Sequence, residues 1–153
     1  MELFRVDKRL YNLDSLIISS NQYQLKINDK GRSLESCLDK YRPNNKPRRN
    51  QYLFAFEEYK DAYNFWTKMI DGKFYKVLVE EKDILHKGDM KIIDKLFKIQ
   101  NPDNEELCNM YWEGLGTSNP CWEYIVTKAY VIDLISIDEK ARQLALNKRW
   151  GMI

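Results

Sequence analysis

The segment CWEYIVTKAYVIDLI, residues 121–135, restricts the fold of this chain more than any other feature. It is rich in β-branched and aromatic residues, which favour strands, yet a carboxylate, Glu123, stands near its head. Glu123 either marks the point where a strand meets solvent, or the strand holds that carboxylate in a fixed position. In both cases the chain must build a β-sheet, and the other segments decide between the two interpretations.

Three further segments have strand patterns. Residues 2–10 begin with an alternation of polar and apolar side chains, which is typical of a half-buried strand. QYLFAF, residues 51–56, is short, aromatic and apolar, as expected for a buried strand. KFYKVLVEE, residues 73–81, places Tyr75, Val77 and Val79 on one face. The sequence therefore predicts several mostly antiparallel strands.

Helical stripes lie between these strands. Residues 33–41 have apolar side chains at helical spacing, opened by Ser33, and residues 57–72 repeat this pattern up to Gly72. Further helices are predicted from residue 90, after Pro102 and from about residue 138 to the tail. The sum is an α+β fold, with helices packed on the sheet, in a single domain over residues 1–153.

Composition excludes several classes of protein. Hydrophobic residues make up 44% of the 153 and charged residues 31%, so the chain can form a core. The net charge of +2 is too balanced for bulk nucleic-acid binding. Three cysteines without a CxxC pair and a single histidine predict neither a metal site nor a disulfide framework. No leader-like apolar region or run of about 20 apolar residues is present, which predicts a cytoplasmic location.

One basic segment stands out from this balance. KYRPNNKPRRN, residues 40–50, contains five Lys or Arg residues and two prolines, so it is predicted to be a loop. Such a loop is either a solvated connection or a surface that contacts phosphates through side chains such as Arg48 and Arg49.

Common catalytic motifs are absent. The chain has no Walker loop, no GxGxxG after a strand, no GxSxG and no HExxH. His86 is the only histidine, and its neighbours in LHKGD predict a surface turn, which does not favour a Ser-His-Asp site.

Three β segments each carry one distinctive polar group: Arg5 in LFRVD, Tyr52 in QYLFAFEEYKDAYNFW and Glu123 in WEYIV. In this order they resemble the ADP-ribosyltransferase superfamily, whose signature is spread over three strands. LFRVD is similar to the YR form of the first element. The second element is an aromatic strand that runs into a helix with a small residue, here Ala62. WEYIV is similar to the NEYIV stretch of poly-ADP-ribose polymerases, in which the Glu is catalytic.

The resemblance implies an α+β fold with a split antiparallel β-sheet core around an NAD cleft. It implies a mono-ADP-ribosyltransferase that transfers ADP-ribose from NAD, as cosubstrate, to a macromolecule without a metal. Glu123 would be the catalytic residue, because a fixed carboxylate stabilises the oxocarbenium ion that forms when the nicotinamide bond breaks. The residues implied to bind NAD are Arg5, Tyr52, Tyr63, Phe65 and Tyr75. Packing in the core is the alternative for the last three.

The acceptor does not follow from the family pattern. Arginine-modifying relatives carry Glu two residues before the catalytic Glu, whereas Cys121 stands there in this chain. Trp122, if not buried, could stack on a base, and Arg48 and Arg49 could contact phosphates, so the acceptor is predicted to be RNA, single-stranded DNA or a protein. The mixed Arg, Tyr and Glu pattern resembles small bacterial toxins and antiphage effectors, which implies an antitoxin or inhibitor protein as a partner.

Two alternatives remain open at the level of sequence. The chain could be a non-enzymatic module that binds nucleic acid or protein through the basic loop 40–50, with its aromatic strands serving only as core. It could also be a transferase-like fold that has lost catalysis. Convergence of Arg5, Tyr52 and Glu123 on one pocket would favour the enzyme, and dispersal of the three over the surface would defeat that interpretation.

Overall fold

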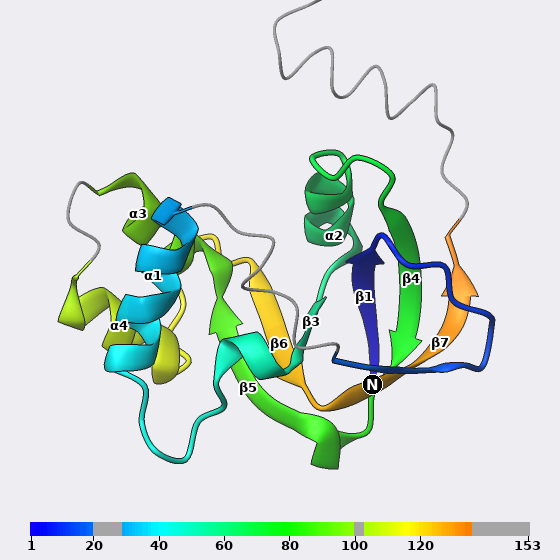
Figure 1. The fold of residues 1–153 in the computed structure, drawn as a ribbon, viewed down its shortest axis with the longest axis horizontal. Coiled ribbons are helices and arrows are strands. Elements are labelled where there is room, and N and C mark those ends of the chain that lie inside the picture. The colour runs from blue at the N-terminus through cyan, green and yellow to red at the C-terminus, as the bar shows by residue number, and fades with distance from the viewer. Residues whose placement is uncertain (20–28, 100–102, 136–153) are drawn as a thin grey trace, which may run out of the picture.

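The computed structural model describes residues 1–19, 29–99 and 103–135 (Figure 1). Its strands are β1 (Glu2–Asp7), β2 (Leu16–Ile18), β3 (Leu53–Phe56), β4 (Lys73–Leu78), β5 (Ile84–Asp89), β6 (Trp122–Val126) and β7 (Lys128–Leu134). Its α-helices are α1 (Asp29–Lys40), α2 (Tyr59–Trp66), α3 (Met90–Lys98) and α4 (Glu105–Trp112), and its short 3-10 helices are η2 (Arg49–Gln51) and η3 (Glu81–Asp83). The predicted α+β class is confirmed.

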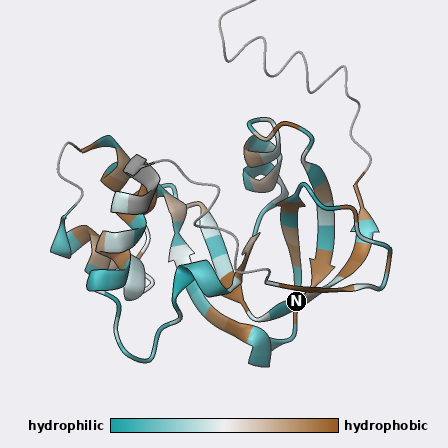
Figure 2. Cartoon of the chain, in the orientation of Figure 1, coloured by the Kyte–Doolittle hydropathy of each residue, from teal (hydrophilic) through white to brown (hydrophobic). Residues whose placement is uncertain are grey.

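Within the described residues the strands form one seven-stranded antiparallel sheet in the order β2-β7-β4-β1-β3-β6-β5. Figure 1 shows α1, α3 and α4 grouped at the β5 and β6 end, while α2 lies by β1 and β4. Apolar residues are concentrated on the strands and on the helix sides that face them, whereas the connection from α1 to η2 is hydrophilic (Figure 2).

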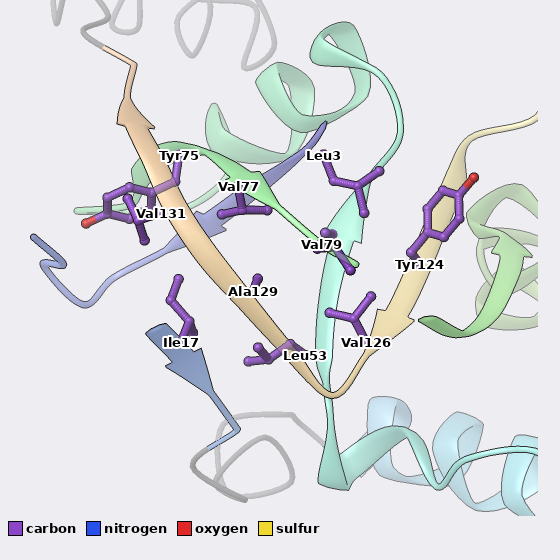
Figure 3. Close-up of a cluster of buried hydrophobic side chains, with 11 residues drawn as sticks. Leu3, Ile17, Leu53, Tyr75, Val77, Val79, Tyr124, Val126, Ala129 and Val131 are labelled. Carbon is purple, nitrogen blue, oxygen red and sulfur yellow. The ribbon is translucent and has the colours of Figure 1, made fainter. Parts of the chain in front are cut away.

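One face of the sheet carries a core of buried apolar residues, most of them aliphatic. Leu3 on β1, Val77 on β4 and Val131 on β7 are fully buried, and their side chains point toward a common interior (Figure 3). Alternation explains this arrangement, because residues at i and i+2 of a strand leave the same face. The predicted common face of Tyr75, Val77 and Val79 is confirmed, since all three belong to this core.

The opposite face is covered by two groups of helices. Phe56 and Phe74 pack under Ala62 and Trp66 of α2. At the other end Ile125 of β6 packs under the apolar sides of α1, α3 and α4. The caps support these helices: Asp89 accepts a hydrogen bond from Lys91 N, and Asn104 accepts one from Leu107 N.

Four expectations from the sequence differ from the structure. The helix predicted over residues 57–72 is α2, which ends at Trp66 and does not reach Gly72. The segment around His86 is strand β5, not a surface turn, and the His86 side chain is 3% exposed. The β-prone run 121–135 forms two strands, β6 and β7, which are separated at Thr127 and are not neighbours in the sheet. The first helix begins at Asp29, before Ser33. The predicted helix from about residue 138 lies outside the described residues.

Candidate functional site

The register of the sheet places Glu123 in a row of side chains on the face that carries the helices. Glu123 is opposite Phe56 of β3 and Gly88 of β5, and Phe56 is in turn opposite Phe4 of β1. Opposed residues of neighbouring strands project from the same face. Glu123 therefore lies between the part of the sheet covered by α2 and the part covered by α1, α3 and α4.

The two oxygens of the Glu123 carboxylate have different surroundings. Oε1 accepts a hydrogen bond of 2.7 Å from the Tyr111 hydroxyl and one of 2.5 Å from Nη1 of Arg49. Oε2 has no hydrogen-bond partner among the described residues. The residue as a whole is 3% exposed. The carboxylate is thus anchored through one oxygen, while the other accepts no hydrogen bond from the described residues.

Arg49 supplies the positive charge that offsets the cost of burying the Glu123 carboxylate. Its Nε donates to both oxygens of Glu35, at 3.1 and 2.9 Å, and its Nη1 donates to Glu123 and to the Tyr111 hydroxyl. The guanidinium also lies over the Phe54 ring, with 4.7 Å from Cζ to the ring centroid. A planar, permanently charged group with forked donors suits a site between two buried carboxylates.

Tyr111 of α4 completes the cluster as a hydrogen-bond donor. Burial raises its pKa well above the usual value, the Arg49 charge opposes this and the Glu123 carboxylate adds to it, so the phenol stays protonated. Its ring lies directly against the backbone of Gly88, the neighbour of Glu123 across the sheet.

Substituting Gly88 with Ala should destabilise the protein by about 1–3 kcal/mol, because an added Cβ would lie 2.3 Å from Cε2 of the fully buried Tyr111. Gly72 is the matched control, since a Cβ there meets the flexible Met69 side chain at 3.0 Å. Chemical denaturation of both variants measures the difference. Equal stability of the two variants would contradict the close packing of Tyr111 on β5.

Asp89 fixes the loop that leads into β6. It is fully buried, and its carboxylate accepts hydrogen bonds of 2.8–2.9 Å from Lys91 N, Thr117 N, Thr117 Oγ1 and Cys121 N. Burial alone would raise its pKa, but these hydrogen bonds outweigh burial and lower the pKa. The start of β6, and with it Glu123, is tied to the N-terminus of α3.

Arg5 does not meet Glu123. It follows Phe4 in β1 and is opposite Tyr75, so its side chain leaves the other face of the sheet. Its Nη1 donates to the Phe54 carbonyl at 2.7 Å, and its Nη2 pairs with Asp7 at 2.9 Å. The first of these bonds joins β1 to β3, and the second lies within β1.

The aromatic residues predicted to bind NAD are divided between the two faces. Tyr75 is fully buried on the Arg5 face, where its hydroxyl donates to the Arg9 carbonyl. Tyr52 is half-buried against the cluster formed by α1, α3 and α4. Tyr63 and Phe65 are on α2, and the Phe65 ring lies 5.4 Å from that of Phe56, which adjoins Glu123 in the row. Phe65 is thus joined to the site through Phe56.

Of the residues predicted to contact the acceptor, Arg48 and Arg49 line one cavity, and Trp122 does not. Trp122 is half-buried, with the Lys87 ammonium 4.7 Å from its ring centroid. Arg48 has an exposed side chain and pairs with Asp39 at 3.3 Å. Arg49 is only 7% exposed and is bound by Glu35 and Glu123, so the expectation of a basic surface loop was wrong for this residue.

A cavity of about 300 Å³ opens beside Arg49. It is lined by Glu35, Ser36, Asp39, Arg48, Arg49, Asn50 and Trp112. Its walls offer both charges and several hydrogen-bonding groups, so it suits a polar ligand. Nowhere in residues 1–19, 29–99 and 103–135 do three His, Cys, Asp or Glu side chains gather in a way that would hold a metal ion.

His86 lies beneath the site and is neutral. Burial and the charge of Lys46 lower its pKa to about 4, although the hydrogen bond at 3.0 Å between Nε2 and the Tyr111 carbonyl opposes this. Its ring centroid is 5.0 Å from those of Tyr111 and Trp112. Neutral His86 therefore supports the helix that carries Tyr111.

We expect the free energy of unfolding to fall by about 2–3 kcal/mol between pH 6.5 and pH 4, since one pKa unit corresponds to about 1.4 kcal/mol. In that range the unfolded chain protonates His86, whose ordinary pKa is 6.5, while the folded protein protonates it only at about 4. The unfolded state then binds more protons and gains stability as the pH falls. Because the chain has one histidine, NMR titration of that imidazole tests this directly, and a midpoint near 6.5 in the folded protein would contradict it.

Three residues of the site had no clear signal in the sequence. Glu35 and Tyr111 belong to ordinary amphipathic helices, and Asp89 looked like part of a turn. The three join Glu123 and its supporting loop only through tertiary contacts.

No helix in the described ranges has the length and apolar character needed to cross a membrane.

Comparisons with known proteins give a family and no function. No curated protein matches the chain. A family model matches residues 18–139, a range that includes Glu35, Arg49, Tyr111 and Glu123 and leaves out β1 with Arg5. The chain belongs to the family described as "Protein of unknown function (DUF2441)".

Proposed function

We propose that this protein is an NAD-dependent mono-ADP-ribosyltransferase in which Glu123 is the catalytic residue. The observation that carries the proposal is the state of this carboxylate: it is 3% exposed, held through Oε1 by Tyr111 and Arg49, and free of hydrogen bonds from the described residues at Oε2. A carboxylate fixed in this way can stabilise a developing positive charge without reorganising.

The order of the strands supports the proposal. The three segments that resemble the transferase signature form β1, β3 and β6, which are consecutive in the sheet. The elements are far apart in the sequence, and the sheet brings them side by side. We infer that the sheet is the ADP-ribosyltransferase-like core.

The chemistry requires few groups. The bond between nicotinamide and ribose breaks with its electron pair leaving on nicotinamide, and the ribose becomes an oxocarbenium ion. Oε2 of Glu123 would lie beside this ion and stabilise it electrostatically. Arg49 and Tyr111 would keep the carboxylate in place during the reaction, as supporting groups must.

The roles of the other predicted residues are adjusted to their contacts. Phe65, 37% exposed and packed on Phe56, would offer an aromatic face to nicotinamide, and Tyr63 is its neighbour on α2. Arg5 is committed to Asp7 and the Phe54 carbonyl, so we assign to it the positioning of β1 against β3. Arg48 and Asn50, which line the cavity beside Arg49, are the groups proposed to meet a nucleic-acid acceptor.

The test is transfer of label from NAD. The pure protein is incubated with NAD labelled in its adenylate half and with a cell lysate separated into protein and nucleic-acid fractions. We expect label to enter one fraction, and, if that fraction is RNA or single-stranded DNA, transfer should weaken steeply with salt. No nicotinamide release and no NAD binding by calorimetry would overturn the proposal.

A binding module is the second candidate, and the cavity favours it. Arg48, Asn50 and Ser36 line a polar cavity that could bind a partner without any reaction. On this hypothesis charge reversal of Arg48 abolishes binding of single-stranded oligonucleotides, while Glu123→Gln leaves it unchanged.

A further inference from the structure

Glu35 on α1 and Glu123 on β6 share one guanidinium, that of Arg49. All three side chains are buried, and the ion pairs are 2.9 Å from Arg49 Nε to Glu35 Oε2 and 2.5 Å from Arg49 Nη1 to Glu123 Oε1. The triad formed by Glu35, Arg49 and Glu123 therefore holds two negative charges and one positive charge. Tyr111, which donates to Glu123, is protonated and adds no charge.

The two carboxylates engage the guanidinium differently. Glu35 receives Nε at both of its oxygens, at 3.1 and 2.9 Å, whereas Glu123 receives only Nη1, and only at Oε1. A guanidinium that pairs with a single carboxylate favours two parallel hydrogen bonds, one to each oxygen. Arg49 does not pair with Glu123 in this way, since its Nε edge is directed at Glu35. Oε2 of Glu123 consequently accepts no hydrogen bond from the described residues.

The balance of charge explains how a buried, ion-paired carboxylate can still attract a cation. A Glu123 carboxylate that paired with Arg49 alone would form a neutral pair, whose net attraction for an oxocarbenium ion is small. Glu35 adds a second negative charge, so the triad is anionic as a whole. Because the three groups are buried, water and salt screen this charge only weakly.

We propose that Glu35 is a positioning residue, which holds Arg49 by its Nε edge and thereby preserves the negative charge of Glu123 for the reaction. The inference rests on the proposed transferase function. Glu35 does not touch NAD in this role, because it acts through Arg49. When the charge of Glu35 is removed, Arg49 is attracted to Glu123 alone and pairs with both of its oxygens. The carboxylate opposite the oxocarbenium ion is then neutralised, although Glu123 itself is still present.

The experiment compares Glu35→Gln with a matched control on the other face of the sheet. Asp7→Asn also removes a carboxylate that is 8% exposed and that pairs with an arginine at 2.9 Å, but this arginine is Arg5. Both variants lose a buried ion pair and should be less stable than the wild type. Nicotinamide release by the pure proteins over a range of NAD concentrations gives kcat and KM. Circular dichroism checks that each variant is folded at the assay temperature.

For Glu35→Gln we expect kcat to fall about 10–100-fold while KM changes by less than about threefold, because the lost interaction acts on the transition state. Glu35→Asp keeps the charge, so its kcat should lie within about threefold of the wild type and above that of Glu35→Gln. Asp7→Asn should keep the wild-type kcat within about twofold, despite its lower stability.

Three results would overturn the role of Glu35 alone. They are a wild-type kcat in folded Glu35→Gln, a kcat of Glu35→Asp no higher than that of Glu35→Gln, and an equal fall in kcat for Asp7→Asn, which would trace the loss to stability. A wild-type protein that releases no nicotinamide would overturn the proposed function, and the role of Glu35 with it.

Discussion

Replacing Glu123 with Gln is expected to lower the rate of NAD cleavage by about 10²–10³-fold, the range found when one preorganised electrostatic group is removed from an active site. Gln has nearly the same shape, and its carbonyl oxygen can still accept hydrogen bonds from Tyr111 and Arg49. The fold should therefore persist while the charge opposite the oxocarbenium ion is lost. Nicotinamide release by the pure variant measures the rate, and circular dichroism with thermal unfolding checks the fold.

Glu57→Gln is the control for this substitution. Glu57 follows β3, next to the strand of Glu123, and accepts hydrogen bonds from Lys87 and Tyr124 instead of Arg49. It should retain the wild-type rate within about twofold. If Glu123→Gln cleaves NAD as fast as Glu57→Gln, Glu123 is a structural residue and the transferase assignment fails.

The sequence was sufficient for most of the fold because its signals are local. The alternation in β1, the aromatic run of β3 and the stripe of α2 each follow from side-chain periodicity, and each appears in the structure near its expected residues. Burial of one side of a strand or of a helix produces the spacing of its apolar residues directly. The α+β class needed no more than these elements.

Strand β5 could not be predicted from local sequence patterns. Its alternation is broken by a register shift between Ile84 and His86 and by Gly88, and both favour the interpretation of a turn. Gly88 is required because the Tyr111 ring occupies the space of a side chain. Since Tyr111 is 23 residues further along the chain, no local pattern could have indicated this contact.

The candidate site was only partly predictable for the same reason. Glu123 was singled out by its place in a β-prone run and by resemblance, but its partners come from η2 and α4, and α1 supplies Glu35, which binds Arg49. Arg49 stands in a segment rich in prolines and positive charges, a composition typical of solvated loops. Its burial depends on Glu35 and Glu123, which only the tertiary fold brings together.

Arg5 illustrates a different limit. Its presence on the first strand was predicted, and alternation alone places it on the face of Leu3. The sequence could not show whether Glu123 lies on the same face as Arg5. That depends on the register of β1 with β3 and of β3 with β6. A shift of one residue in either register would have brought Arg5 to the face of Glu123.

Replacing Arg49 with Met should lower the free energy of unfolding by about 3–5 kcal/mol, as is typical when one partner of a buried ion pair is removed. Met fills a similar volume, so the loss reports mainly on charge. Glu35 and Glu123, which are 8% and 3% exposed, would lose the cation that they share. The melting temperature should fall by roughly 10 °C in a thermal unfolding experiment.

Two comparisons make this result specific to the buried pair. Arg48→Met removes the neighbouring arginine, whose side chain is exposed and pairs with Asp39 at the surface. This substitution should lower the free energy of unfolding by less than about 1 kcal/mol. The double variant Arg49→Met, Glu123→Gln should have a free energy of unfolding at least about 1 kcal/mol above that of Arg49→Met alone. The reason is that only one of the two buried carboxylates, Glu35, then keeps its charge. If Arg49→Met is no less stable than Arg48→Met, the carboxylates do not depend on Arg49. The Glu123 side chain would then lack the fixed position on which its proposed catalytic role depends.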